Sequence, residues 1–320
     1  MRTLIALAVA LCVAAAASAG TPAPRPVALV VAETANAVYA VSMGAGGGHV
    51  LKRVSVVDPL MVAAPLHGPA VVLSPATGSV TLLGWHALRR LKVFHGFRDP
   101  EVARIAPGGR YAYVNDGKTG DLTVIDLAQR SIIRRIFVGA GAHHMAFSPD
   151  GKHLWIALSE VATTVLRLDT SNLRRPRIVG RLHPRFPGHS VGFAPDGRTV
   201  WLSSAEKPYV MVYGAATAKL VKLVGAGRAP QEAAFSGARA LLTSGYGSSI
   251  EAVLWRTYRR LGTVPLPYGS FNLATYGGEV VTSSLLTGYV TELDAGTLHR
   301  RWTVKVAPET RYVAISLWPG

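Results

Sequence analysis

Short apolar stretches alternate with polar turns along nearly the whole chain. The clearest example is residues 138–159, with the sequence VGAGAHHMAFSPDGKHLWIALS. Two apolar strands flank a Ser-Pro-Asp-Gly turn, in which proline presets the φ angle of the second position, aspartate stabilises the turn and glycine accepts the positive φ that follows. This pattern predicts a β-hairpin with two histidines at the entry to its first strand.

The hairpin unit recurs along the chain at intervals of 39 to 46 residues. The residues at the position of the turn proline are Pro65, Pro107, Pro149, Pro195, Gly237, Tyr276 and Leu317. A period in this range with several short strands per unit is typical of propeller blades, and no long segment has helical periodicity. Trp155 and Trp201 follow their turn prolines by the same spacing, so we expect both to pack between blades. We predict an all-β fold, a seven-bladed β-propeller of four-stranded antiparallel blades, over residues 27–320.

The two ends of this repeat region match different parts of one unit. Residues 311–320, RYVAISLWPG, match the lead-in and innermost strand, whereas residues 27–33, VALVVAE, match the second strand. We expect these segments to pair within one blade, because such pairing removes the open sheet edge of a circular array.

The first nineteen residues have the pattern of a secretory signal peptide. A basic residue, Arg2, precedes an apolar run over residues 4–16 and a small-residue cleavage site at residues 17–19. We predict cleavage after Ala19, a Pro-rich leader over residues 20–26, and a secreted or periplasmic, cell-envelope location; an uncleaved membrane anchor is the alternative. The only cysteine, Cys12, lies in the removed segment, so the mature chain is expected to contain no disulfide or thiolate metal site.

The chain is strongly basic, with 34 Lys and Arg against 18 Asp and Glu and a formal net charge of +16. Such a charge attracts anionic polymers, envelope surfaces and acidic ligands. The arginines are scattered, and no recognition helix or aromatic-basic motif accompanies them, so we expect no specific nucleic-acid binding. The expected partners are a protein, a glycan or an anionic envelope polymer, and the mature chain is expected to be a monomer without a transmembrane span.

Several segments resemble a known repeat family. VIDL with YVND, the stretch VGAGAHHMAFSPDGKHLWIAL, and VGFAPDGRTVWLSS are similar to the YVTN-type repeats of secreted bacterial and archaeal seven-bladed propellers. The resemblance extends over residues 27–318 and is strongest over residues 100–215. Proteins of this architecture include surface-layer and adhesion proteins, lactonases and the haem-binding propeller of cytochrome nitrite reductases. The resemblance therefore implies the fold and export, and leaves the function open.

In a propeller, the segment that enters each innermost strand lies at the mouth of the central channel. We therefore expect the residues six and five positions before each turn position to form a ring around that mouth. Convergence of polar groups on a concave surface is the usual sign of a binding site. One side of this predicted ring is polar, and the eight residues that we expect to converge there are Glu101, His143, His144, His189, Gln231, Glu232, Arg311 and Tyr312.

One interpretation of the ring is a metal or haem site. His143 or His144, together with His189 and a carboxylate from Glu101 or Glu232, offers nitrogen and oxygen ligands suited to zinc, copper or iron. Adjacent residues of an extended strand point to opposite sides, so we expect only one of the two neighbouring histidines to reach the channel.

Two other interpretations stay open. A lactonase-like hydrolase can use a histidine or Glu232 as a base, but the sequence contains no nucleophile elbow to accompany it. Alternatively, the ring consists of solvated residues at the mouth of a binding or scaffolding module. We expect this last role, with a metal- or haem-binding propeller as the alternative, and assign no catalytic residue.

Overall fold

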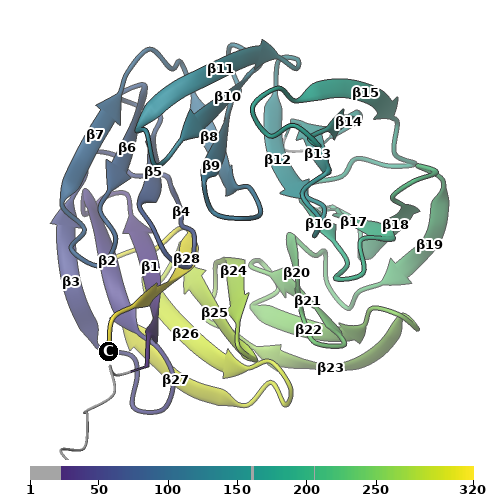
Figure 1. Cartoon of the computed structure of the whole chain (residues 1–320). Helices are drawn as coiled ribbons and strands as arrows, with labels where there is room; N and C mark the ends of the chain where they lie inside the picture. Colours follow the sequence, from purple (N-terminus) through teal and green to yellow (C-terminus); the bar gives the residue numbers. More distant parts are fainter. Residues whose placement is uncertain (1–22, 160–161, 205) are drawn as a thin grey trace, which may run out of the picture.

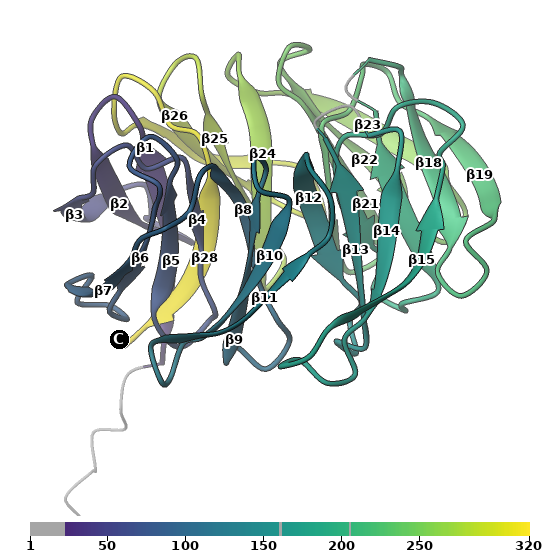
Figure 2. The same cartoon turned by 90° about the horizontal axis from the view of Figure 1, so that it is seen from above.

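A computed structural model describes residues 23–159, 162–204 and 206–320. Seven four-stranded antiparallel sheets stand as blades around a central axis (Figure 1), and an edge-on view shows the short, thick ring that they form (Figure 2). No helix occurs in the described residues. The predicted fold class is therefore confirmed, whereas the predicted signal peptide, residues 1–19, and the start of the predicted leader lie outside the described residues.

Each blade runs outward from the axis through four strands. The innermost strands are β28 (Val313–Trp318), β4 (Met61–Ala63), β8 (Pro100–Ile105), β12 (Ala142–Phe147), β16 (Val191–Phe193), β20 (Glu232–Ser236) and β24 (Ser270–Tyr276). The second strands are β1 (Arg25–Ala32), β5 (Ala70–Ser74), β9 (Tyr111–Asp116), β13 (His153–Leu158), β17 (Thr199–Ser203), β21 (Arg239–Ser244) and β25 (Glu279–Ser284).

The outer half of each blade is built in the same way. The third strands are β2 (Ala37–Ser42), β6 (Ser79–Leu83), β10 (Asp121–Asp126), β14 (Val165–Asp169), β18 (Tyr209–Gly214), β22 (Ser249–Leu254) and β26 (Tyr289–Asp294). The outermost strands are β3 (Val50–Ser55), β7 (Arg90–Phe94), β11 (Ser131–Phe137), β15 (Arg177–Leu182), β19 (Leu220–Gly225), β23 (Arg259–Pro265) and β27 (Arg300–Lys305).

The core lies between neighbouring blades, and the middle strands are therefore apolar on both faces. Every residue of β5 and of β6 is buried, whereas most residues of the outermost strands are exposed. The predicted tryptophan packing is confirmed: Trp155 meets Phe193 of the next blade edge to face, and Trp201 meets Phe235 in the same way one blade further on. Edge-to-face contact is a favoured geometry for aromatic pairs.

The ring is closed by pairing of the two ends of the repeat region. β28 runs antiparallel to β1, in register from Arg25 opposite Trp318 to Val30 opposite Val313. Two further backbone hydrogen bonds, between Val31 and residues 311 and 312, continue the ladder toward the channel mouth. The predicted closure is confirmed, and Figure 1 shows β28 and β1 side by side within the first blade.

A buried carboxylate makes a second connection where the ring closes, between the first blade and the last blade; we call this boundary the closing seam. The Gly44 amide, in the loop between β2 and β3, donates to both oxygens of Glu292 in the last blade, at 3.1 and 2.9 Å. The Glu292 side chain is 0% exposed, with Arg301 3.7 Å away. Burial and the neighbouring Glu279 carboxylate raise the pKa of this carboxyl, the Gly44 amide and Arg301 oppose them, and the net result is a pKa of about 7.

Removal of β28 is expected to unfold the ring. A chain that ends at Glu309 loses the buried side chains of Val313, Ile315 and Leu317 and exposes the edge of β1. Burial of an aliphatic side chain is worth about 1.5–3 kcal/mol, so the loss approaches the whole stability of a typical domain, about 5–15 kcal/mol. Circular dichroism should detect no cooperative melting transition. A chain that lacks only residues 319–320, which follow β28, should melt like the full chain; identical melting of both truncations would contradict this role of β28.

Glu292 should make the stability of the ring depend on pH. The native state favours the protonated carboxyl, so its contribution is complete below the ordinary glutamate pKa of 4.5 and is lost as the pH rises through about 7. Glu292→Gln keeps an oxygen acceptor for the Gly44 amide but cannot ionise. We expect urea unfolding midpoints of the wild type to fall between about pH 5 and pH 8 relative to this variant. Exposed Glu206→Gln is the matched control, and parallel midpoint curves for wild type and Glu292→Gln would refute the effect.

Candidate functional site

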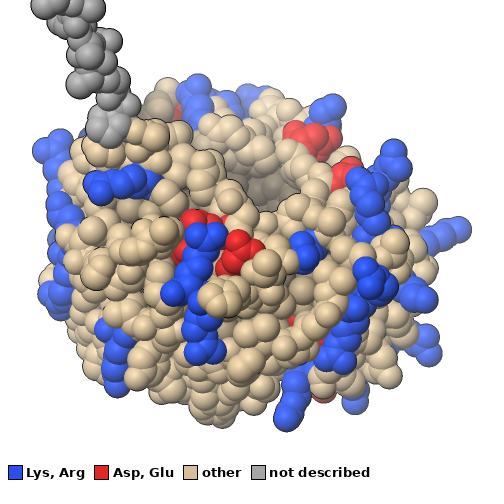
Figure 3. All heavy atoms as spheres, turned by 90° about the horizontal axis from the view of Figure 1, so that it is seen from below, with Lys and Arg blue, Asp and Glu red and all other residues tan. Residues whose placement is uncertain are grey.

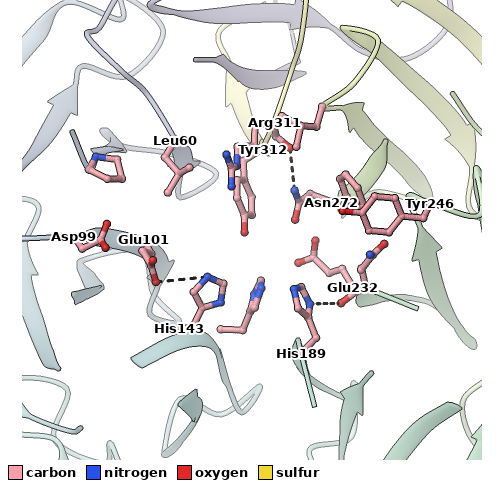
Figure 4. Close-up of a pocket in the computed structure, with 15 residues that line it drawn as sticks. Leu60, Asp99, Glu101, His143, His189, Glu232, Tyr246, Asn272, Arg311 and Tyr312 are labelled. Atoms are coloured by element: carbon pink, nitrogen blue, oxygen red, sulfur yellow. Dashed lines mark hydrogen bonds and ion pairs between the residues drawn. The ribbon is translucent and has the colours of Figure 1, made fainter. Parts of the chain in front are cut away.

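All eight polar residues of the predicted ring line one cavity of about 390 Å³ at the channel mouth. Figure 4 shows them converging from separate blades. Leu60 and Phe271, also at ring positions, line it too. The other lining residues, which do not lie at the predicted ring positions, are Pro75, Asp99, Tyr246, Asn272 and Leu285. Pro75, Tyr246 and Leu285 lie in the loops that follow second strands. The position of these loops in each repeat unit could therefore have predicted them.

A cluster of three histidines lies at the centre of this cavity. The rings of His143 and His144, on β12, have centroids 4.3 Å apart, and that of His189 lies 4.4 Å from the ring of His144. The expectation that only one of the two neighbouring histidines reaches the channel is wrong. The pairing of β12 with β13 shifts register between Ala142 and Met145, and this bulge breaks the alternation of side chains so that both histidines line the cavity.

Contacts from neighbouring blades hold the histidines in place. The side-chain amide of Asn115 donates to the carbonyl oxygen of His143, and the Glu101 carboxylate lies 3.6 Å from His143 Nε2. His189 Nδ1 lies 3.1 Å from the carbonyl oxygen of Gln231, in the next blade. A carbonyl can only accept, so Nδ1 of His189 carries a proton in this contact. His143 and His189 are thus each held by contacts with the blade beside them.

Burial keeps two of these histidines neutral. Removal from water is the main cause that lowers the pKa of His143, the neighbouring His189, Arg104 and Arg311 add to the shift, and together they bring the pKa to about 3. The pKa of His144 is well below its usual range, mainly because the ring is only 2% exposed. His144 Nδ1 has no hydrogen-bond partner among the described residues. At neutral pH the cavity therefore contains uncharged imidazoles, which have a lone pair to offer.

An ion pair across the channel forms the floor of the cavity. Arg104, on β8, approaches Glu232, on β20, at 3.4 Å, although two other blades separate these strands around the ring. Glu232 also accepts a hydrogen bond from the Leu273 amide at 3.2 Å. Burial raises the pKa of this carboxyl, and Arg104 opposes the shift. Glu232 lines both the mouth cavity and a second cavity of about 440 Å³ between the innermost strands, so the pair lies between the two.

The histidine cluster does not form a closed metal site. Across residues 23–159, 162–204 and 206–320, no three His, Cys, Asp or Glu side chains are placed to share one metal ion. At the rim, Arg311 pairs with Glu33 at 3.1 Å. The arrangement therefore offers single nitrogen donors and a cation rather than a ligand cage.

The basic side chains do not gather in one patch on the visible surface. Figure 3 shows Lys and Arg spread over that face, with acidic side chains at a few places among them. The part of the chain that the structure describes contains no helix with the length and apolar character needed to cross a membrane.

Comparison with known proteins finds a local family match. Residues 67–175, about a third of the chain, match the family model of the Cytochrome D1 heme domain. No curated protein matches the sequence. The family match supports a relationship to one propeller family over these residues, and the YVTN resemblance stays an expectation.

Solved structures share the propeller fold at low sequence identity. A functionally unknown protein from Desulfotomaculum acetoxidans DSM 771 has a TM-score of 0.77 at 14% identity, with 92% of this chain and 99% of that chain covered. Hydrazine synthase of Kuenenia stuttgartiensis has a TM-score of 0.63 at 16% identity, covering 74% and 76%. Dihydro-heme d1 dehydrogenase NirN in complex with DHE has a TM-score of 0.64 at 16% identity, covering 88% and 64%. At such identities these likenesses establish the fold alone.

His143 is expected to stay neutral in mildly acidic solution. The unfolded chain binds a proton on this ring below about pH 6.5, whereas the native ring does so only near pH 3. The stability that depends on the neutral ring is therefore complete above pH 6.5 and is lost as the pH falls toward 3. Ring ¹⁵N shifts, assigned with His143→Gln, should still report a neutral imidazole at about pH 5. Exposed His86 serves as the solvent reference, and a protonated His143 at that pH would contradict the effect of burial.

Proposed function

We propose that this protein is an exported binding propeller whose mouth cavity takes a haem-type tetrapyrrole. The observation that carries the proposal is the cluster of three histidines, from two neighbouring blades, within one cavity. Haem iron needs one axial nitrogen donor, unlike a bare metal ion, which needs a set of protein ligands. The cluster therefore suits haem better than it suits a free metal ion.

The donor chemistry of the cavity fits this group. The Gln231 carbonyl accepts a hydrogen bond from His189 Nδ1, and such a contact is usual on the outer side of a metal-binding histidine. Nε2 is then the nitrogen that would bind a metal. His144 adds a buried nitrogen with no partner among the described residues. We assign His189 as the residue that would hold the haem iron and His144 as a second nitrogen donor in the same cavity. When bound, haem supplies a redox centre or a coordination site for a small molecule.

The walls and charge of the cavity fit an amphipathic anion. Leu60, Leu285 and Phe271 supply apolar surface, and the Arg311 guanidinium at the rim suits the carboxylates of a tetrapyrrole. A cavity of about 390 Å³ lies within the usual range for small-molecule sites. The net positive charge of the chain adds a general attraction for an anionic ligand.

The local match to the Cytochrome D1 heme domain and the likeness to NirN also support the proposal, since the names of both refer to haem. The binding role expected from the sequence is kept, with haem as its ligand. The hydrolase alternative, with a histidine or Glu232 as its base, has no comparable support from the family match or the similar structures. The Glu232 carboxylate is also engaged by Arg104 and the Leu273 amide.

Titration of the untagged protein with haem tests the proposal. We expect uptake of one equivalent and a Soret band typical of histidine ligation. His189→Ala should weaken haem binding by about tenfold or more, because the assigned ligand is lost, and added imidazole should restore the band. His86→Ala, which removes an exposed histidine away from the cavity, is the matched control.

Three results would contradict haem binding at this site. The first is a wild-type protein that takes up no stoichiometric haem. The second is unchanged haem affinity in both His189→Ala and His144→Ala. The third is stoichiometric binding of zinc or copper without haem, which would favour the metal site instead.

A further inference from the structure

An exposed aromatic surface adjoins the mouth cavity. The Tyr246 side chain is 69% exposed and that of Tyr268 is 48% exposed, with ring centroids 6.4 Å apart. Phe271 lies 4.9 Å from Tyr246 in an edge-to-face contact, and Leu286 is exposed beside them. Single exposed apolar residues are common, but a contiguous exposed group beside a cavity is typical of a binding surface.

The backbone holds this surface in place. A Cβ atom at Gly245 would overlap the ring of Phe271, so the loop after β21 lies directly on that ring. Gly269 has a φ of 89°, and a Cβ atom there would lie 2.7 Å from the Leu286 amide nitrogen. The loop after β21 of one blade therefore packs on Phe271 of the next blade, and the Tyr246 ring makes an edge-to-face contact with it. The Tyr246 ring is therefore held by its contact with Phe271 although most of its surface is exposed to solvent.

The aromatic surface is continuous with the cavity. Tyr246, Phe271 and Leu285 line it together with the histidines. In Figure 4 Tyr246 lies at one side, Glu101 lies at the opposite side, and His143 and His189 lie between them. One cavity thus combines nitrogen donors with an aromatic side wall.

We infer that Tyr246, supported by Phe271 and Tyr268, is a stacking surface for the flat conjugated ring of the ligand and selects planar ligands. This inference rests on the proposed function and adds the residue that recognises the ring rather than the iron. Tyrosine suits the position because its ring offers a large apolar face while its hydroxyl tolerates water. Stacking of a flat conjugated ring on an aromatic side chain is worth about 1–3 kcal/mol by alanine substitution.

Two probes separate stacking from ligation: haem, and metal-free protoporphyrin IX, which has the same ring but no iron. Tyr246→Ala should weaken the binding of both by about tenfold, because it removes the stacked ring. Tyr246→Phe should bind both as the wild type does. His189→Ala, in contrast, should weaken haem binding much more than protoporphyrin binding. Tyr209→Ala, at a 42% exposed tyrosine that does not line the cavity, is the matched control.

The possible failures of the two proposals can be told apart. If the wild type binds haem and Tyr246→Ala binds both probes equally well, the stacking role is overturned and the proposed function stands. If Tyr246→Phe loses as much affinity as Tyr246→Ala, the hydroxyl carries the contact and stacking is again overturned. If the wild type binds neither probe, the proposed function itself fails. Each variant should melt at the same temperature as the wild type. A loss of affinity then results from the change in the cavity and not from unfolding.

Discussion

The pairing of β28 with β1 is the constraint on which the rest of the structure depends. It joins the two ends of the repeat region in one blade, so every blade has neighbours on both sides and the ring has no open edge. Closure also brings the starts of the innermost strands to one mouth. Arg104 and Glu232 lie on blades that are not neighbours, and their contact across the channel exists only because the ring is closed.

Closure buries ionisable groups, and these groups respond to pH in opposite directions. Burial disfavours the charged form of a carboxyl and of an imidazole alike, which raises the pKa of Glu292 and lowers that of His143. The seam is therefore weakened as the pH rises and the mouth is weakened as the pH falls. The ring is expected to be most stable between the pH at which His143 takes up a proton and the pH at which Glu292 loses one. In that range His143 is neutral and Glu292 is still protonated.

The mouth cavity unites three kinds of chemistry from separate parts of the chain. Imidazoles come from two neighbouring blades, an aromatic wall comes from the next two blades along the ring, and an arginine comes from the closing segment. Some of these groups are positioned by the backbone of the blade beside them, as the Gln231 carbonyl positions His189 and Gly245 packs on Phe271. A site built in this way is preorganised, which reduces the entropy cost of binding.

The sequence by itself determined the repeat, the seven blades, the closing strands and the eight polar residues of the mouth, because turn chemistry and spacing recur at equivalent positions in each unit. The tertiary structure alone decided three features. The bulge in β12 turns both His143 and His144 into the cavity, and it depends on pairing with β13. The Arg104–Glu232 floor depends on distances across the channel. The exposure and support of Tyr246 depend on the packing of two neighbouring blades, which no periodic pattern within one unit specifies.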